Sequence, residues 1–553
     1  MLNFIIGRNN SGKTEKIRAL IAERASENKK CILIVPEQFS FESERSILEK
    51  IGAQKMLNVD ILSFTRLAFV INEQYGKALN KTIDDGTRKV LMSLSLEALS
   101  GKLEYFKRFS SKPALLSNLL TFVTELKQCA VTPDEIAEIS GKTGNKSLGK
   151  KLSELSLIAA SYDALVSRSF FDDENLLTIA ADMISETDFF DGKAVYFDAF
   201  CGFTKQERNC IKSILPKAEN VFISLCTDRD SSREGVSVFE NVNSEFSHLK
   251  ECAAEQNVGV SSPEILNVKE DGRSPELVYL EKYLCGEESE PYKEDCDNIV
   301  VCAAGNRADE ADFVACEIKK LLRCNPTLRC RNIAVIERTA GTYDKELSES
   351  FKKYGVPMFE DKRRPIGIQP VMVFVKCLLA LCAESFSTES FMRLLKTGLT
   401  ALSGDEISEL ENYAFLWNID GSKWRRDFTE NPDGLGFDVT EKSQEKLIRL
   451  NDIRKRSVLP VLAFKKDFEE ADGEKKSRLI YEFLIKNGVT ERLREKIEYL
   501  VSSGDTVLCE EQDTVWATLM DMLGKMASAI GETVITAKRY SELFNILLSA
   551  VTL

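Results

Sequence analysis

The sequence predicts an α/β protein that combines a parallel sheet with large all-helical segments. In the first seventy residues, short apolar runs alternate with helical periodicity, and a glycine-rich motif stands between the first run and the first helix. From about residue 84 to residue 190 only helical periodicity follows. Strands that are apolar throughout and separated by helices are typical of a parallel sheet covered on both faces.

The first part of the chain supplies the elements of this sheet. One helix should carry Ile17, Leu20 and Ile21 on a single face, and another should begin near Ser40. The strands of the sheet are expected at residues 2–6, 31–35, 59–62, 194–200 and 220–225. Because only helices are expected between the third and fourth of these strands, we interpret that segment as an insertion between strands of one sheet.

A second α/β unit is expected after an acidic linker. Residues 287–297 are acidic, contain proline and have few apolar side chains, which is typical of a linker. Strands are then expected at residues 299–303 and 333–336, on either side of a helix. After about residue 369 the periodicity is again mainly helical.

Length and composition indicate a large globular protein of ordinary balance. A chain of 553 residues predicts two to four domains. The net charge of −13 means that any contact with nucleic acid needs a locally basic cleft. The fifteen cysteines form no CxxC pair and His248 is the single histidine, so a zinc site is not expected. No signal peptide or membrane span is expected, and we predict a cytoplasmic protein with reduced thiols.

The glycine-rich motif predicts a binding site for ATP. It matches GxxxxGK[ST] and consists of Gly7, Arg8, Asn9, Asn10, Ser11, Gly12, Lys13 and Thr14. Glycines allow such a loop to wrap around an anion, and backbone N–H groups at the helix N-terminus point at the phosphates. Lys13 should then reach the β- and γ-phosphates and Thr14 should ligate Mg²⁺. The alternative is a turn that is merely rich in glycine.

An acidic partner for the metal is expected at Asp198. Residues 194–197 are apolar and run directly into this aspartate, which is the form of a Walker B segment. The next residue is Ala199, where helicases usually carry a glutamate that orients the attacking water. General-base assistance contributes roughly 10²- to 10⁴-fold, so hydrolysis should be slow unless another carboxylate, such as Glu207, substitutes.

Further segments along the chain carry distinctive residues. They are Val35–Glu42 (VPEQFSFE), Leu62–Ala68 (LSFTRLA), Asp198–Phe200 with residues 203–204 and 206–207, Asn332–Arg338, Tyr354–Pro357, residues 361–362, and residues 412–413 with Trp424. Together with the glycine-rich motif, and in the expected order over nearly the whole chain, these segments resemble the AddB family, the partner of the AddA motor in AddAB complexes.

The resemblance implies a P-loop, RecA-like, superfamily-one helicase architecture with two large helical insertions. Residues 1–85 with 190–290 would form the first RecA-like domain, which carries the P-loop, and residues 86–189 would form its insertion. Residues 297–380 would begin the second RecA-like domain, and residues 381–553 would be an incomplete part of its insertion.

The resemblance also implies roles for particular residues. Arg338 would contact the γ-phosphate from the second domain, although a surface arginine after a strand is the alternative. Gln38, Ser63 and Phe64 occupy positions that face single-stranded DNA in such folds, where an aromatic ring could stack on a base; Phe64 could equally be plain core. The basic run at residues 362–364 could meet phosphates or lie in a solvated loop.

For function, the resemblance implies an ATP-binding, DNA-binding subunit of a helicase/exonuclease that processes double-strand breaks for recombinational repair. Its partners would be an AddA-type subunit and single- and double-stranded DNA ends. AddB-type proteins are about twice this length, and their nuclease domain and 4Fe-4S cluster have no residues in this chain. Ala199 fits a scanning subunit without motor activity. The alternatives are an active helicase motor, a P-loop phosphotransferase, and an assembly scaffold in which nucleotide is structural.

Overall fold

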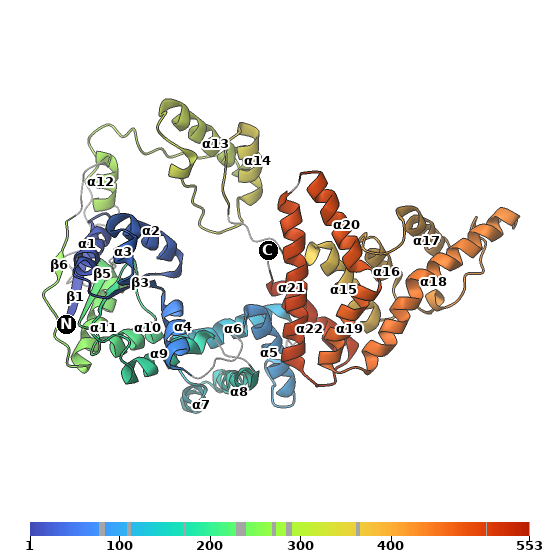
Figure 1. Ribbon diagram of the computed structural model, residues 1–553, viewed down its shortest axis with the longest axis horizontal. Coiled ribbons are helices and arrows are strands. Elements are labelled where there is room, and N and C mark those ends of the chain that lie inside the picture. The colour runs from blue at the N-terminus through green and yellow to red at the C-terminus, as the bar shows by residue number, and fades with distance from the viewer. Residues whose placement is uncertain are drawn as a thin grey trace. The chain divides into compact units, whose positions relative to one another are not determined.

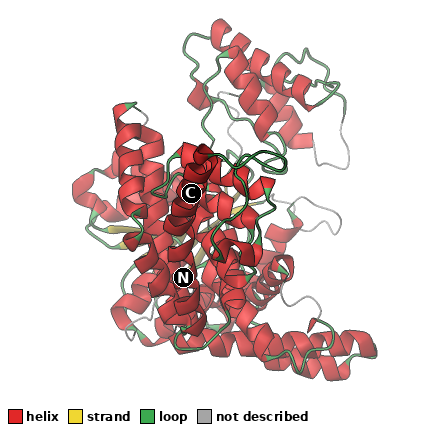
Figure 2. Cartoon of the chain, turned by 90° about the vertical axis from the view of Figure 1, so that its right-hand side faces the viewer, coloured by secondary structure: helices red, strands yellow, loops and turns green. Residues whose placement is uncertain are grey.

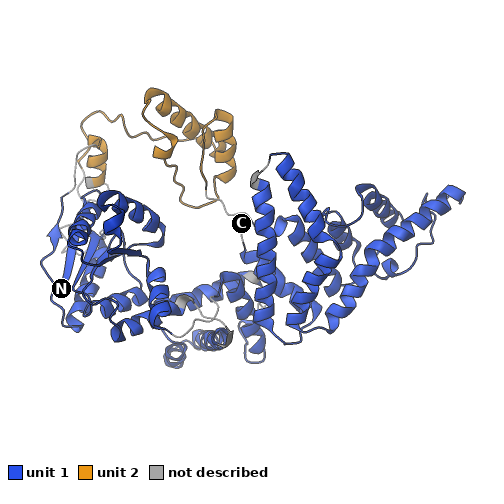
Figure 3. Ribbon diagram, in the orientation of Figure 1, with its two compact units in different colours: residues 1–232, 239–267, 364–553 blue, residues 233–238, 268–363 orange. Residues whose placement is uncertain are grey.

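The chain forms two compact units (Figure 3). Unit 1 comprises residues 1–232, 239–267 and 364–553, and unit 2 comprises residues 233–238 and 268–363. The computed structural model describes residues 1–76, 83–107, 112–169, 173–227, 239–267, 273–283, 290–360, 365–504 and 506–551. Within these residues, no helix is both long enough and apolar enough to cross a membrane.

Unit 1 contains a six-stranded sheet in which every pair of neighbours is parallel (Figure 1). The strand order is β3-β2-β4-β5-β1-β6. The strands are β1 (Leu2–Gly7), β2 (Cys31–Ile34), β3 (Val59–Leu62), β4 (Ala194–Phe197), β5 (Asn220–Cys226) and β6 (Glu264–Ile265). The predicted parallel sheet is therefore confirmed. The two-residue strand β6, whose side chains are exposed, was not predicted.

Alternate residues of a strand point to opposite faces of the sheet, and here both faces carry apolar side chains. Helices therefore cover both faces. Along β1, Phe4 and Ile6 join one core cluster and Ile5 joins another. The Ile5 face is covered by α1 (Lys13–Ser26) and α2 (Ser40–Ile51), with the 3₁₀ turn η1 (Glu37–Phe39) and α3 (Ala53–Met56) nearby. The opposite face is covered by α4 (Phe64–Tyr75), α9 (Asp173–Glu186), α10 (Lys205–Ile214) and α11 (Glu240–Glu255).

Between β3 and β4 the regular elements among the described residues are all helices. Besides α4 and α9, this segment contains α5 (Asp85–Ala98), α6 (Pro113–Gln128), α7 (Pro133–Lys142) and α8 (Lys146–Ser169). Because β2 pairs with both β3 and β4, the strands before and after these helices belong to one sheet.

The rest of unit 1 is a helical body (Figure 2). It consists of α15 (Pro370–Ala383), α16 (Thr388–Leu395), α17 (Gly404–Leu416), α18 (Glu441–Glu470), α19 (Gly473–Lys486), α20 (Val489–Ser502), α21 (Thr506–Ile530) and α22 (Ala537–Ala550), with the 3₁₀ turns η4 (Ile366–Ile368) and η5 (Gly421–Arg425). One hydrophobic core runs from the helices of residues 83–166 into this body. Two ion pairs join α5 and its N-cap to the body: Asp84–Lys525 at 2.7 Å and Glu97–Arg539 at 3.0 Å.

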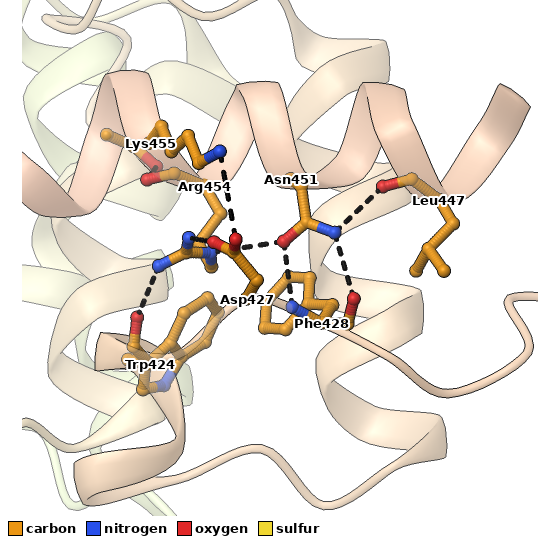
Figure 4. A network of polar contacts seen from close by, with 8 residues as sticks. Trp424, Asp427, Phe428, Leu447, Asn451, Arg454 and Lys455 are labelled. Carbon is orange, nitrogen blue, oxygen red and sulfur yellow. Dashed lines mark hydrogen bonds and ion pairs between the residues drawn. The ribbon is translucent and has the colours of Figure 1, made fainter. Parts of the chain in front are cut away.

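A buried arginine fixes the loop after η5 to α18 (Figure 4). The side chain of Arg454 is 3% exposed and pairs with Asp427. Its guanidinium donates to the Trp424 carbonyl oxygen at 3.0 Å. One helical turn earlier, Asn451 Oδ1 accepts from the Phe428 backbone N–H at 2.7 Å and Asn451 Nδ2 donates to the Phe428 carbonyl oxygen at 3.0 Å. The loop is thereby held through backbone groups that would otherwise be buried without partners.

Unit 2 contains α12 (Pro275–Tyr283), α13 (Arg307–Cys324), the 3₁₀ turn η3 (Cys330–Asn332) and α14 (Asp344–Tyr354). A small core joins α13 to α14 around Ala315, Ile318 and Phe351. The predicted strands at residues 299–303 and 333–336 are not formed: neither segment has strand pairing. A strand needs a hydrogen-bonded neighbour, and the apolar side chains here lack cover, since Val301 is 93% and Ile336 90% exposed.

Candidate nucleotide-binding site

The glycine-rich motif forms a tight loop between β1 and α1. The strand ends at Gly7 and the helix begins at Lys13. Two residues of the loop adopt the left-handed conformation, Asn10 with φ 60° and Gly12 with φ 87°. Glycine and asparagine are the residues that tolerate this conformation best. The reversal of the chain is closed by a hydrogen bond from the Ser11 N–H to the Arg8 carbonyl oxygen at 3.3 Å.

Close packing at the base of the loop requires glycine at position 7. A Cβ atom there would lie 2.3 Å from Ser11 Oγ and 2.8 Å from the backbone oxygen of Leu266. Ser11 is buried, and its hydroxyl has no hydrogen-bond partner among the described residues. A buried hydroxyl without a partner is costly, so Ser11 is a group in this loop for which a hydrogen-bond partner would be favourable.

Lys13 turns back into the loop. Its Nζ donates to the carbonyl oxygens of Gly7 at 2.8 Å and Arg8 at 2.7 Å. Burial lowers the pKa of the Lys13 ammonium, and the neighbouring Cys226 and Asp198 side chains oppose that shift. The Lys13 ammonium is thus held inside a loop that leads directly into the N-terminus of α1. A cation together with the N–H groups of a helix N-terminus suits phosphate oxygens.

The other motif residues surround this centre. Thr14 lies half-buried in the first turn of α1, while Asn9 and Asn10 are exposed. The guanidinium of Arg8 lies 5.6 Å from the centroid of the Phe239 ring.

Asp198 follows β4 at the same edge of the sheet, with β5 between it and β1. It is 5% exposed and accepts a hydrogen bond of 2.5 Å from the hydroxyl of Ser224. Its backbone N–H donates to the Ile34 carbonyl oxygen at 3.1 Å. Ser224 was missed by the sequence analysis, although a serine inside the apolar strand NVFISLC is the signal that could have found it. The sheet therefore brings the predicted aspartate to the edge that carries the loop.

No carboxylate stands directly after Asp198. Ala199 is there instead, in the left-handed conformation with φ 65°. Glu207 is engaged elsewhere, because its carboxylate accepts from the Thr204 N–H at 2.7 Å as part of the capping box of α10. Burial raises the pKa of Glu207, and its hydrogen bonds with Thr204 act in the opposite direction. In this structure Glu207 is thus a capping residue.

Two of the residues expected to face DNA are buried. Ser63 is 2% exposed, caps α4 by accepting from the Arg66 N–H, and donates to Glu37 Oε1 at 2.6 Å. Phe64 is 6% exposed and packs against the rings of Phe197, Phe200 and Phe203. This burial disagrees with an exposed stacking ring at Phe64 and agrees with the alternative, a core residue. The rings that cover Phe64 come from residues far along the chain.

Gln38, by contrast, is exposed at the carboxyl end of β2. Two neighbouring aromatic side chains that were not predicted as DNA contacts are also exposed, Phe39 at 36% and Phe41 at 77%. The repeated phenylalanine directly after Gln38 is the sequence signal for them.

The remaining predicted residues lie in or beside unit 2. Arg338 is in the turn region between η3 and α14, and its contact with a γ-phosphate stays a prediction. Residues 362–364 lie outside the described residues. Among the described residues, no group of three or more histidine, cysteine, aspartate or glutamate side chains could hold a metal ion by itself.

The fold and this site define the class: an α/β protein whose parallel sheet carries a glycine-rich, lysine-containing loop at its carboxyl edge. More particularly, the chain belongs to the family described as ADDB, N-terminal, which matches residues 4–281.

Similar curated proteins are named as one of the subunits of an ATP-dependent helicase/deoxyribonuclease. The protein from Acetivibrio thermocellus is 29% identical over 561 residues, covering 99% of this chain and 48% of the relative. That from Clostridium acetobutylicum is 29% identical over 552 residues, covering 98% and 48%. That from Thermoanaerobacter sp. is 29% identical over 556 residues, covering 99% and 48%. The chain spans about half the length of the curated relatives it matches.

Proposed function

We propose that this chain is an ATP-binding and DNA-binding part of a helicase/exonuclease subunit that processes double-strand DNA breaks for recombinational repair. The observation that carries the proposal is the inward-facing Lys13 at the centre of the loop, with Asp198 at the same edge of the sheet. The relatives' name, which describes an ATP-dependent helicase/deoxyribonuclease, supports it. In finer terms we propose a P-loop, RecA-like, superfamily-one architecture.

The residues present fit Mg-ATP. The Lys13 ammonium, now bonded to two loop carbonyls, and the Ser11 hydroxyl, which lacks a partner, would be the groups that bond phosphate oxygens. Thr14 would ligate Mg²⁺ directly and Asp198 would hold its water shell, oriented by the Ser224 hydroxyl. When bound, the nucleotide supplies phosphoanhydride chemistry; the protein's part is to neutralise its charge and fix its position.

The same site supports a subunit without motor activity. Ala199 supplies no general base, and Glu207 is committed to its capping box. Without general-base assistance hydrolysis loses roughly 10²- to 10⁴-fold. We therefore propose weak or absent turnover, with bound nucleotide serving structure or signalling while an AddA-type partner drives translocation.

We propose that the exposed segment at Gln38, with Phe39 and Phe41, contacts the unwound strand. Exposed aromatic rings beside a polar side chain suit single-stranded DNA, because every base offers a face for stacking. Ser63 would not contact the strand itself; its hydroxyl would hold the side chain of Glu37, the residue before Gln38. In the same scheme unit 2 belongs to the second RecA-like domain, and Arg338 of this unit would contact the γ-phosphate. We propose no nuclease site and no 4Fe-4S cluster on residues of this chain.

The test is ATP binding and ATP turnover on one purified sample, with and without single-stranded DNA. Lys13→Ala removes the central cation, and Lys50→Ala, an exposed lysine on α2, is the matched control. We expect the Lys13 variant alone to lose binding, with negligible turnover in every sample.

Three outcomes would contradict the proposal. Brisk DNA-stimulated turnover would favour an active motor. Phosphoryl transfer to a small molecule, without affinity for DNA, would favour a phosphotransferase. If Lys13→Ala destabilised the fold but left DNA processing unchanged, the nucleotide would be purely structural and the chain a scaffold.

A further inference from the structure

A concentration of lysines lies where α7 meets α8, away from the nucleotide site. Residues 139–153 contain Lys142, Lys146, Lys150 and Lys151 and no acidic residue, in a chain whose net charge is −13. Lys142, Lys146 and Lys150 are exposed, and Lys151 is half-buried. A local excess of lysine is informative in an acidic chain, because the overall composition does not account for it.

The turn that presents these lysines is held in place by close packing. A Cβ atom on Gly149 would lie 2.9 Å from the Ser140 carbonyl oxygen and 3.1 Å from Thr143 Cγ2, so only glycine lets α8 approach the end of α7. The two helices are also joined by a hydrogen bond of 2.8 Å from the Ser156 hydroxyl to the Pro133 carbonyl oxygen. Lysines from both helices therefore belong to one surface.

A second basic segment is fastened beside the first by Glu154. This residue of α8 is 7% exposed, and its carboxylate accepts from the backbone N–H groups of Glu104, Tyr105 and Phe106 at 2.8 to 3.1 Å. The Glu154 carboxylate is thereby held by three backbone amides. The fastened segment carries the exposed Lys102 and Lys107.

Contacts between the two segments confirm that they lie together. Lys150 pairs with Glu104 at 3.2 Å, and the Lys151 ammonium lies 5.8 Å from the centroid of the Tyr105 ring. We define the lysine surface as Lys102, Lys107, Lys142, Lys146, Lys150 and Lys151. Two exposed carboxylates border it: Glu104 pairs with Lys150, and Glu138, just outside residues 139–153, pairs with Lys142. Six lysines against these two carboxylates and that of Glu154 leave the surface with a net positive charge.

We propose that the lysine surface binds the phosphate backbone of duplex DNA without reading its sequence. Lysine ammonium groups act as point charges for phosphates, whereas contacts with unstacked bases need free aromatic faces. Here the Tyr105 ring already faces Lys151, which favours phosphates over bases. The inference rests on the proposed function in one respect: that function names DNA as the polyanion. The duplex contact itself involves neither the nucleotide site nor the segment at Gln38.

The test is the affinity of the full chain for a short fluorescent duplex, measured over a series of salt concentrations. The test variant combines Lys146→Gln, Lys150→Gln and Lys151→Gln. The control combines Lys466→Gln, Lys486→Gln and Lys496→Gln, which remove the same charge from exposed positions of the helical body. Since each phosphate contact contributes about 0.9 to the slope of log affinity against log salt, the test variant should lose about 2 to 3 from that slope, and the control little.

Equal losses in both variants, or none in the test variant, would overturn the inference. So would a test variant that keeps duplex binding but loses binding of a single strand. ATP binding measured on the same samples separates the two proposals. Wild-type chain that binds ATP but no duplex refutes the lysine surface alone, whereas a lysine effect on duplex binding without any ATP binding refutes only the nucleotide site.

Discussion

Gly473 and Gly404 occupy the same position in two helices but differ in the space around them. Each is the first residue of its helix and follows a capping side chain, Asp472 in α19 and Ser403 in α17. A Cβ atom on Gly473 would lie 2.2 Å from Ile530 Cγ2 and 2.7 Å from Ile530 Cβ, whereas one on Gly404 would meet nothing within 4 Å. The same substitution should therefore have opposite effects at the two sites.

The magnitude follows from two opposing contributions. Replacing glycine by alanine at a compatible position stabilises a protein by about 0.4–1 kcal/mol, because the unfolded chain loses freedom. Inserting a methyl group into a packed site costs about 1–3 kcal/mol. The backbone at Gly473 cannot shift away from Ile530, because two hydrogen bonds hold it. The Gly473 N–H donates to the Thr533 carbonyl oxygen at 3.1 Å, and the Glu474 N–H donates to the Gly531 carbonyl oxygen at 2.9 Å. We expect Gly473→Ala to lose about 0.5–2 kcal/mol and Gly404→Ala to gain up to about 1 kcal/mol.

Tryptophan fluorescence is well suited to this comparison. All three tryptophans, Trp417, Trp424 and Trp516, lie in the helical body that contains both glycines. Chemical denaturation followed by this signal therefore reports unfolding of the body and not of the sheet. Relative to wild type, the midpoint should fall for Gly473→Ala and stay or rise for Gly404→Ala. Equal midpoints for the two variants, or the reverse order, would refute the packing described for α19 against α21.

Three further predictions concern other parts of the molecule. Ala199→Gly should stabilise the end of β4 by about 0.5–1 kcal/mol, since alanine is strained at φ 65°; unchanged hydrogen exchange of residues 194–203 would count against this. Arg454→Met should cost about 1–3 kcal/mol by stranding the Trp424 carbonyl oxygen, and Lys455→Met, the exposed neighbour, should cost little by the same fluorescence assay. Hydrogen bonds from Asn298 lower the pKa of Glu276 from 4.5 to about 2, so its stabilising effect is complete above pH 4.5 and is lost as the pH falls toward 2. Between pH 4.5 and 2, protection of the Asp297 and Asn298 amides from hydrogen exchange should weaken. The Glu276→Ala variant should lack this protection already at neutral pH.

Those parts of the fold and site that depend on local pattern were predictable from the sequence. The loop from Gly7 to Thr14, the strand before Asp198 and the parallel sheet all follow from short apolar runs and glycine positions. For Phe64 the sequence left two alternatives, a stacking ring and a core residue, because the rings that bury it come from residues 197–203, which are distant in sequence. Apolar runs at residues 299–303 and 333–336 looked like strands, yet pairing depends on a neighbour that periodicity does not reveal.

The single core shared by α5 and the last helices has a consequence for synthesis on the ribosome. The strands of the sheet have all been made by residue 265, so the sheet can assemble early. Asp84, in contrast, is separated by 441 residues from its partner Lys525. At about 5–20 residues per second, the ribosome needs roughly 20–90 s to cover that interval. During this time the apolar side of α5 is not yet covered by α21 and α22. A nascent chain with exposed apolar surface is prone to aggregation, and we expect chaperones to bind it.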